Sequence, residues 1–244
     1  MRTRALLVIA IGLLAGHARA EQTLVLNSVF YAPVTSEKRD GVLDLTYREL
    51  ARRLGLRIEI RNLAAAERAL INVNEGVVDG DVGRIAGLEK KYPNILSVPV
   101  PVMKFEMAVF SRHADFRVAG PESIKPYSVG LVRGWKILEE AAVGARAVTT
   151  LESAEQAMSM LEKNRVDVVL MEKLQGLRII ETMGIKGVRV LQPNLLEGFF
   201  YLYLNKKHAA LIPRITVELR KMEQDGTLQR IYDSVLAGLP ERVR

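Results

Sequence analysis

The chain has 244 residues, a formal net charge of +7 from 35 basic and 28 acidic side chains, and no cysteine. The lack of cysteine excludes disulfides, thiolate metal sites and a cysteine nucleophile. Charges of both signs are interspersed without a long basic run, so the sequence argues against a nucleic-acid-binding protein.

The first twenty residues have the pattern of a secretory signal peptide. Two arginines precede an apolar run from Ala5 to Ala15, and Ala18-Arg19-Ala20 forms an A-x-A cleavage site. This run is shorter than the roughly 20 apolar residues of a spanning helix; the alternatives are an uncleaved anchor and a buried core helix. We expect cleavage after Ala20 and a periplasmic protein, because no cysteine follows that could carry a lipid anchor. The leader holds three basic and no acidic side chains, so the remaining chain carries +4.

After the leader, short apolar runs alternate with segments of helical periodicity, which predicts strands alternating with helices. Strands are predicted at residues 23–27, 57–61, 96–101, 105–111, 127–132, 147–149, 166–171, 188–191 and 199–204, with a strand or turn at 77–80. Helices are predicted at residues 44–54, 65–75, 135–143, 153–164, 175–183, 213–223 and 227–236. This alternation predicts an α/β protein with parallel sheets flanked by helices, and its restart near residue 112 indicates two similar lobes.

Five segments, in their order and spacing, resemble the type 2 periplasmic solute-binding proteins of family 3, the polar-amino-acid-binding group. They span residues 41–55, 73–79, 129–134, 154–167 and 219–232. The resemblance implies a two-lobed fold with mixed sheets flanked by helices, two hinge strands near residues 108–112 and 196–202, and a ligand held between the lobes. By the same resemblance, lobe 1 comprises residues 21–109 and 201–244, and lobe 2 comprises residues 110–200.

The chain departs from this family at the arginine that holds the ligand. Amino-acid binders of the family usually carry a Thr-Pro-x-Arg segment whose arginine grips the ligand carboxylate, whereas residues 85–93 contain no arginine here. Arginines occur earlier instead, at Arg84 in Asp79-Gly-Asp-Val-Gly-Arg84 and at Arg68 on the preceding helix. This pattern resembles a divergent branch, so an α-amino acid is not carried over as the ligand, and we expect an anionic one.

Ligands of open α/β sheets bind beyond the carboxyl ends of strands, where the candidate residues of this chain are predicted to lie. Arg84 is a candidate anion clamp, because a planar guanidinium binds a carboxylate or phosphate through two parallel hydrogen bonds. Its alternative is a surface arginine in a turn. Arg68 is placed to reach the same site, or else belongs to a solvated helix face.

The other candidates flank further predicted strands. Gly134 and Trp135 form a strand-to-helix turn whose backbone N–H groups favour an anion. Trp135, the single tryptophan, is expected either to stack on the ligand or to pack in the core. Tyr31 is expected to stack on the ligand, or to pack or contact the hinge. By the family resemblance, Glu172 is a candidate partner for a ligand ammonium; otherwise it is a surface glutamate.

The leading hypothesis is a solute-binding protein that closes around a small anionic ligand and presents it to a membrane transporter or sensor. The alternative is a periplasmic enzyme of the same fold, similar to the cyclohexadienyl dehydratases, with Glu172 as its acid or base. The sequence has no His-x-x-x-His or acidic cluster with metal-ligand spacing and no G-x-S-x-G motif, so we expect no metal, no cofactor and no serine nucleophile. We also expect a monomer.

Overall fold

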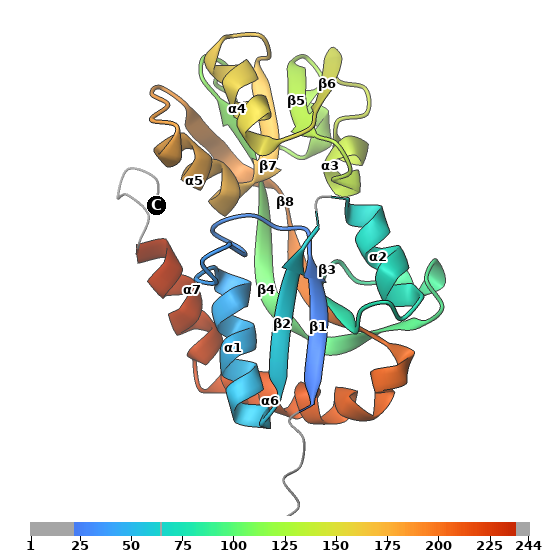
Figure 1. Cartoon of the computed structure of the whole chain (residues 1–244). Coiled ribbons are helices and arrows are strands. Elements are labelled where there is room, and N and C mark those ends of the chain that lie inside the picture. Colours follow the sequence, from blue (N-terminus) through green and yellow to red (C-terminus); the bar gives the residue numbers. More distant parts are fainter. Residues whose placement is uncertain (1–21, 64, 238–244) are drawn as a thin grey trace, which may run out of the picture.

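The structure, a computed structural model, describes residues 22–63 and 65–237, so the predicted signal peptide lies outside the described residues (Figure 1). The helices are α1 (Val42–Leu54), α2 (Ala66–Asn74), α3 (Lys136–Ala141), α4 (Ala154–Glu162), α5 (Lys173–Thr182), α6 (Ile212–Gln224) and α7 (Thr227–Ala237). The strands are β1 (Thr23–Ser28), β2 (Arg57–Asn62), β3 (Gly80–Arg84), β4 (Ile95–Ser111), β5 (Ser128–Val132), β6 (Ala147–Leu151), β7 (Val168–Glu172) and β8 (Arg189–Asn205). None of these helices has the length and apolar composition needed to cross a membrane.

The strands pair in the order β2-β1-β3-β8-β4-β7-β5-β6, and the pairing is mixed. β1 runs parallel to β2 and β3, and β5 runs parallel to β6 and β7. The pairs that involve β4 and β8 are antiparallel. This confirms the α/β class and the mixed sheets implied by the family resemblance, whereas the purely parallel sheets expected from the alternation are wrong.

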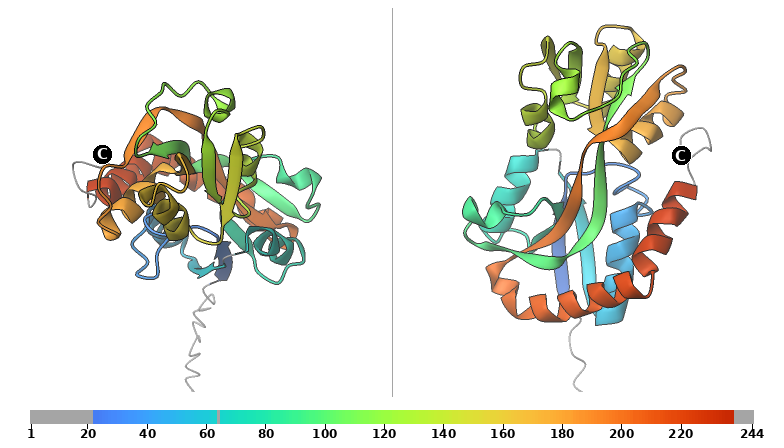
Figure 2. Two further views of the ribbon diagram at one scale, coloured as in Figure 1. Left: turned by 90° about the horizontal axis from the view of Figure 1, so that it is seen from above. Right: turned by 180° about the vertical axis from the view of Figure 1, so that it is seen from behind.

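Two long strands, β4 and β8, pass between the two lobes (Figure 2). Residues 107–111 of β4 pair with β7, and residues 201–204 of β8 pair with β3. Between these stretches β4 and β8 pair with each other, with register shifts at Pro101 and after Met107. The predicted two-lobed fold with two hinge strands is therefore confirmed, while the residue boundaries given for the lobes stay a prediction.

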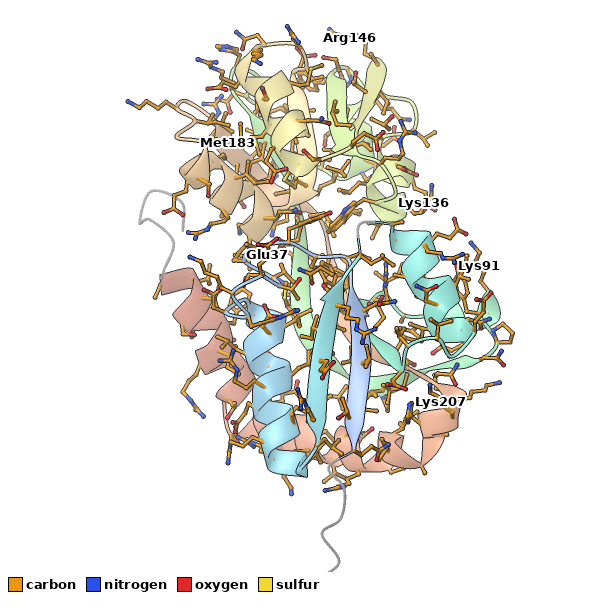
Figure 3. All side chains as sticks on the ribbon, viewed as in Figure 1. Glu37, Lys91, Lys136, Arg146, Met183 and Lys207 are labelled. Carbon is orange, nitrogen blue, oxygen red and sulfur yellow. The ribbon has the colours of Figure 1, made fainter. Side chains whose placement is uncertain are left out.

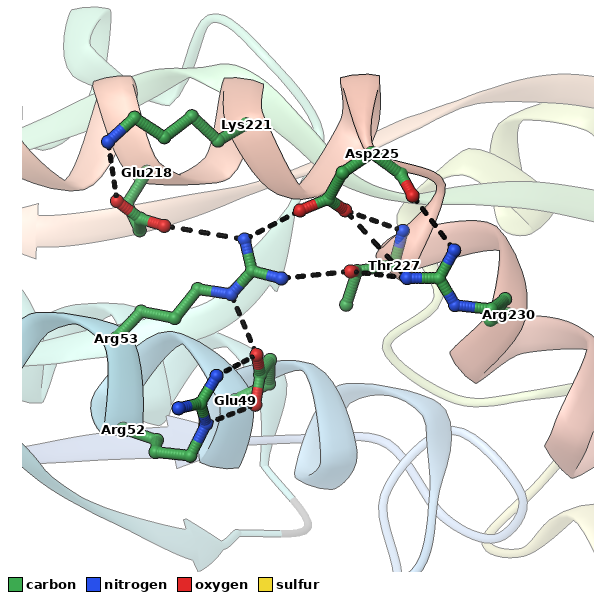
Figure 4. Close-up of polar contacts among 8 residues, drawn as sticks. All are labelled: Glu49, Arg52, Arg53, Glu218, Lys221, Asp225, Thr227 and Arg230. Carbon is green, nitrogen blue, oxygen red and sulfur yellow. Dashed lines mark hydrogen bonds and ion pairs between the residues drawn. The ribbon is translucent and has the colours of Figure 1, made fainter.

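In lobe 1, a network of hydrogen bonds around Arg53 joins α1 to the C-terminal helices α6 and α7 (Figure 4). Arg53 on α1 donates from Nε to Glu49 (2.7 Å), from Nη1 to Asp225 (2.8 Å) and from Nη2 to the Thr227 hydroxyl (2.9 Å). Glu218 on α6 lies 3.4 Å from Arg53 Nη1. The network therefore ties α1 to both C-terminal helices, beside a core that includes the fully buried Tyr47.

Candidate functional site

The interlobe junction is formed by the residues that follow β1, β3, β5 and β7. The carboxyl ends of β1 and β2 face lobe 2, and α3 of lobe 2 lies next to α2 (Figure 1). An electrostatic interaction between α2 and α3 indicates the same proximity. The pKa of Glu67 at the start of α2 is lowered by a hydrogen bond from Lys91, and the charge of Lys136 on α3 adds to this effect. Ends of strands from both lobes therefore meet, as binding sites of open α/β sheets require.

Phe30 and Trp135 make the contact across this junction. Their ring centroids lie 6.2 Å apart in an edge-on arrangement. Phe30 also packs on Phe200 of β8 at 4.8 Å, and Phe200 packs on Phe105 of β4 at 4.7 Å. The four rings connect the hinge strands to the start of α3, so Trp135 packs against the core and borders the junction at the same time.

Tyr31 lies at the same junction but points outward. Its side chain is 49% exposed, whereas the adjacent Phe30 is buried. Its backbone carbonyl accepts hydrogen bonds from the N–H groups of Val34 and Thr35, which closes the loop after β1. The exposed ring leaves Tyr31 available to a ligand, and the packing alternative belongs to Phe30 instead.

Arg84 is the last residue of β3 and is nearly buried, with a side chain 11% exposed. Its Nη2 donates to Asp81 Oδ2 (2.8 Å) and to the Ala66 carbonyl (3.2 Å). Residues three apart on a regular strand point to opposite faces, but the pairing of β3 with β8 shifts register between Asp81 and Arg84. This β-bulge brings the two side chains together, so the alternative of a surface arginine in a turn is wrong.

The ion pair limits what Arg84 offers to a ligand. Each edge of a guanidinium that grips a carboxylate with two bonds includes Nη2, which is already bonded here. Nε is buried and has no hydrogen-bond partner within the described residues. Arg84 thus presents single donors in this conformation, and a two-bond grip requires Asp81 to release Nη2.

Asp81 is the residue that the sequence analysis missed at this site. It is completely buried, and its Oδ1 accepts a hydrogen bond from the Gly83 N–H at 3.2 Å. Burial raises the pKa of the Asp81 carboxyl, and the charge of Arg84 opposes that increase. A Cβ on Gly83 would lie 3.0 Å from the Phe30 ring, so a larger residue would require the ring to shift. The Asp-Val-Gly-Arg spacing is a usable sequence signal for this arrangement.

Arg68 lies in the first turn of α2 and is exposed. It makes no hydrogen bond or ion pair with another residue that the structure describes. Arg68 lies next to the end of α2 that faces lobe 2. Its positive charge adds positive potential to the junction, and it forms no ion pair with another described residue.

Gly134 and Trp135 lie at the junction, but their backbone donors are occupied. The Gly134 N–H donates to Glu139 Oε1 (2.7 Å), and the Trp135 N–H donates to the Val132 carbonyl (3.5 Å). The Glu139 carboxylate takes the place that a negative charge prefers at a helix N-terminus. The backbone anion site expected here is therefore filled by the protein itself, and Trp135 contributes its ring.

Glu172 ends β7 and is buried, so the alternative of a surface glutamate is wrong. Its Oε2 accepts the Gln175 N–H at 2.9 Å and caps α5. Burial raises the pKa of Glu172 to about 7, and the negative charge of Glu106 adds to the increase. The carboxyl is engaged with the N-terminus of α5 in this conformation.

Stability should depend on pH through Glu172. Its pKa is raised from an ordinary 4.5 to about 7, so the native state binds this proton more tightly than the unfolded chain. The resulting contribution of about 3 kcal/mol is complete below pH 4.5 and is lost as the pH rises through about 7. Urea unfolding at both pH extremes measures it, and Glu172→Gln, which keeps the cap acceptor, should remove that part of the pH dependence. Equal pH dependence in the variant would contradict the assignment.

Comparisons with known proteins support this architecture. No family model matches the chain. The L-cystine-binding protein TcyA of Bacillus subtilis is 25% identical over 185 residues, which cover 75% of this chain and 67% of TcyA. The GluR0 ligand-binding core in complex with L-glutamate superposes with a TM-score of 0.78 at 15% identity, covering 89% of this chain and 99% of that one. A histidine kinase sensor domain with similarity to periplasmic binding proteins superposes with a TM-score of 0.73 at 20% identity, covering 88% and 96%. These likenesses confirm the predicted two-lobed fold.

Proposed function

The chain has the fold of the type 2 periplasmic solute-binding proteins, and we propose that it is a solute-binding protein that closes its lobes around a small anionic ligand. The observation that carries the proposal is the meeting of strand ends from both lobes, with Phe30 against Trp135 at the seam. A ligand bound there stabilises the closed form by its differential affinity for that form.

The side chains at the junction favour an anion with an apolar body. Arg84 and Arg68 supply positive charge, while Tyr31, Ile85 and Trp135 supply exposed or half-buried apolar surface.

Several acidic side chains near the junction are engaged with the protein, whereas Glu37 in the loop after β1 is exposed and has no hydrogen bond or ion pair to another described residue (Figure 3). Glu67 pairs with Lys91, Glu139 with Lys136 and Glu152 with Arg133, while Glu172 caps a helix. We favour a carboxylate or phosphonate ligand over an α-amino acid, because the chain lacks the Thr-Pro-x-Arg segment of the amino-acid binders that it resembles.

A thermal-shift screen tests the binding function. Aromatic acids, dicarboxylates, phosphonates and amino acids would each be added to the purified protein. A ligand present at 100 times its dissociation constant stabilises the native state by about 2.7 kcal/mol, which raises the melting temperature measurably. Stabilisation by an amino acid alone would contradict the proposed anionic class but not the solute-binding function, whereas no stabilisation by any class would contradict both.

Trp135 should report the binding event, because it is the single tryptophan and lies at the seam. We expect a ligand found in the screen to change its fluorescence with a saturable titration. Trp135→Phe should lose this signal but still show a ligand-dependent rise in melting temperature. A fluorescence unchanged at saturation would show that the ligand binds away from the junction.

We further propose that the protein is periplasmic, is cleaved after Ala20 and acts as a monomer beside a transporter permease or sensor in the membrane. The transporter partner is supported by the likeness to the substrate binding protein of an amino acid ABC transporter, and the sensor partner by the likeness to the histidine kinase sensor domain. N-terminal sequencing of protein from native cells tests the cleavage, light scattering tests the monomer, and genes adjacent on the chromosome distinguish a permease partner from a kinase.

A further inference from the structure

A groove of about 680 Å³ lies between α1 and β2 in lobe 1, and its lining extends to Arg39 in the loop after β1. α1 and β2 run side by side along it (Figure 1). Five arginines line the groove: Arg39, Arg48, Arg52, Arg57 and Arg61. The carboxylates in the lining are Asp44 and Glu59. The groove is therefore a positively charged surface that the proposed ligand site does not use.

One wall of this groove is a sheet edge that pairs with no further strand among the described residues. β2 ends the strand order, and its pairing with β1 includes bonds from Arg57 N to Gln22 O (3.0 Å) and from Leu63 N to Ser28 O (2.7 Å). Successive residues of a strand direct their backbone groups to opposite sides, so the alternate residues Ile58, Ile60 and Asn62 face the outer edge. Such unpaired donors and acceptors are a template for an added strand.

The charges around this edge are poorly neutralised. Arg48 donates to the Arg39 carbonyl, and neither Arg48 nor Arg61 has a carboxylate partner within the described residues. Arg52 is bound to Glu49 and Arg57 lies 3.3 Å from Glu59, but both arginines are exposed. Exposed ion pairs contribute little, so these arginines exchange readily for the carboxylates of a partner.

The faces of β2 determine where those carboxylates would lie. Ile58 and Ile60 pack toward the core that includes the α1 residues Leu50 and Leu54, so α1 covers that face of β2. Arg57 and Arg61 lie on the opposite face. A strand added to the edge would meet Arg48 on one face and Arg57 and Arg61 on the other. Pairing with β2 of a second copy would instead set like charges together, which disfavours self-association.

We propose that the groove docks an extended, acidic segment of a partner protein, which adds a strand to the free edge of β2. Main-chain hydrogen bonds would provide affinity, and arginines on both faces would select glutamate or aspartate.

The test uses the mature protein and a labelled peptide of alternating glutamate and valine. Fluorescence anisotropy should show binding at about 0.05 M salt that weakens at about 0.5 M, because exposed charges are screened. Arg48→Glu combined with Arg61→Glu should weaken binding about tenfold or more, while the matched exposed control Arg165→Glu on lobe 2 should not. Circular dichroism and melting temperature verify that each variant is folded.

Two further experiments distinguish strand addition from nonspecific electrostatic attraction. A peptide of equal charge with a central proline, which cannot continue a strand, should bind at least about tenfold more weakly. Hydrogen exchange should slow at Ile58, Ile60 and Asn62 when the alternating peptide is bound. Equal binding of both peptides, unprotected β2 amides, or binding to anionic phospholipid vesicles but not to the peptide would overturn the proposal.

Discussion

Replacing Arg84 with alanine is expected to lower the free energy of unfolding by about 3–5 kcal/mol and to weaken binding of the anionic ligand by more than about tenfold. The first effect arises because Asp81, which is completely buried, would lose its cationic partner and keep only the Gly83 N–H as a donor. The second follows from the loss of the cation proposed to hold the ligand. Urea unfolding measures the first effect and calorimetric titration measures the second.

Arg84→Lys distinguishes these two roles. A lysine keeps a positive charge near Asp81, so most of the stability should remain, but it lacks the planar guanidinium and its Nε donor. We expect ligand affinity to fall about tenfold in a protein that still melts close to the wild type. Arg165→Ala, an exposed arginine on lobe 2, serves as the matched control. Unchanged affinity in both Arg84 variants would show that the arginine is purely structural.

Gly176→Ala is expected to destabilise the protein by about 1–3 kcal/mol, even though alanine is the better helix former. A Cβ at Gly176 on α5 would lie 2.2 Å from Cζ of Phe110, whose ring is fully buried on β4. Real contacts are never so short, so the ring or the helix must move. The clash outweighs the gain of about 1 kcal/mol in helix propensity. Urea unfolding curves measure the net change.

A double-mutant cycle checks this explanation. Phe110→Leu removes the far end of the ring and costs stability by itself through the space it leaves. Combined with Gly176→Ala, it should cost less than the sum of the two single changes, because the new methyl group fills that space. Strict additivity of the two changes would mean that the glycine is required for a reason other than Phe110.

Local signals located the helices well. α1 ends at Leu54 with Gly55 in the left-handed conformation, and α4 begins after Ser153, whose hydroxyl accepts the Gln156 N–H. The long strands β4 and β8 were each predicted as two pieces, with residues 102–104 and 192–198 left out. Pairing with a strand far away in the chain keeps these stretches extended, and a local pattern contains no information about that partner.

The candidate site was likewise predictable where it depends on chain order, and not where it depends on contacts between distant segments. Chain order was enough to predict that Tyr31, Arg84, Trp135 and Glu172 follow strands, because strand ends gather where ligands bind. It could not show that Arg84 pairs with Asp81, since that pair depends on a bulge in the register with β8. The buried cap made by Glu172 depends likewise on tertiary packing around β7.

The arginine network around Arg53 has a consequence for biosynthesis. Arg53 bonds to Asp225, 172 positions later in the chain, and the α1 residue Leu50 shares a core with Leu219 of α6. Until the ribosome has delivered α6 and α7, the part of the apolar face of α1 that packs on these helices has no cover, so the nascent chain holds an unfinished lobe 1. Completion of that lobe must follow synthesis, as expected for contacts of such long range. A chain that cannot complete this lobe early stays unfolded for longer, which is compatible with the export proposed above.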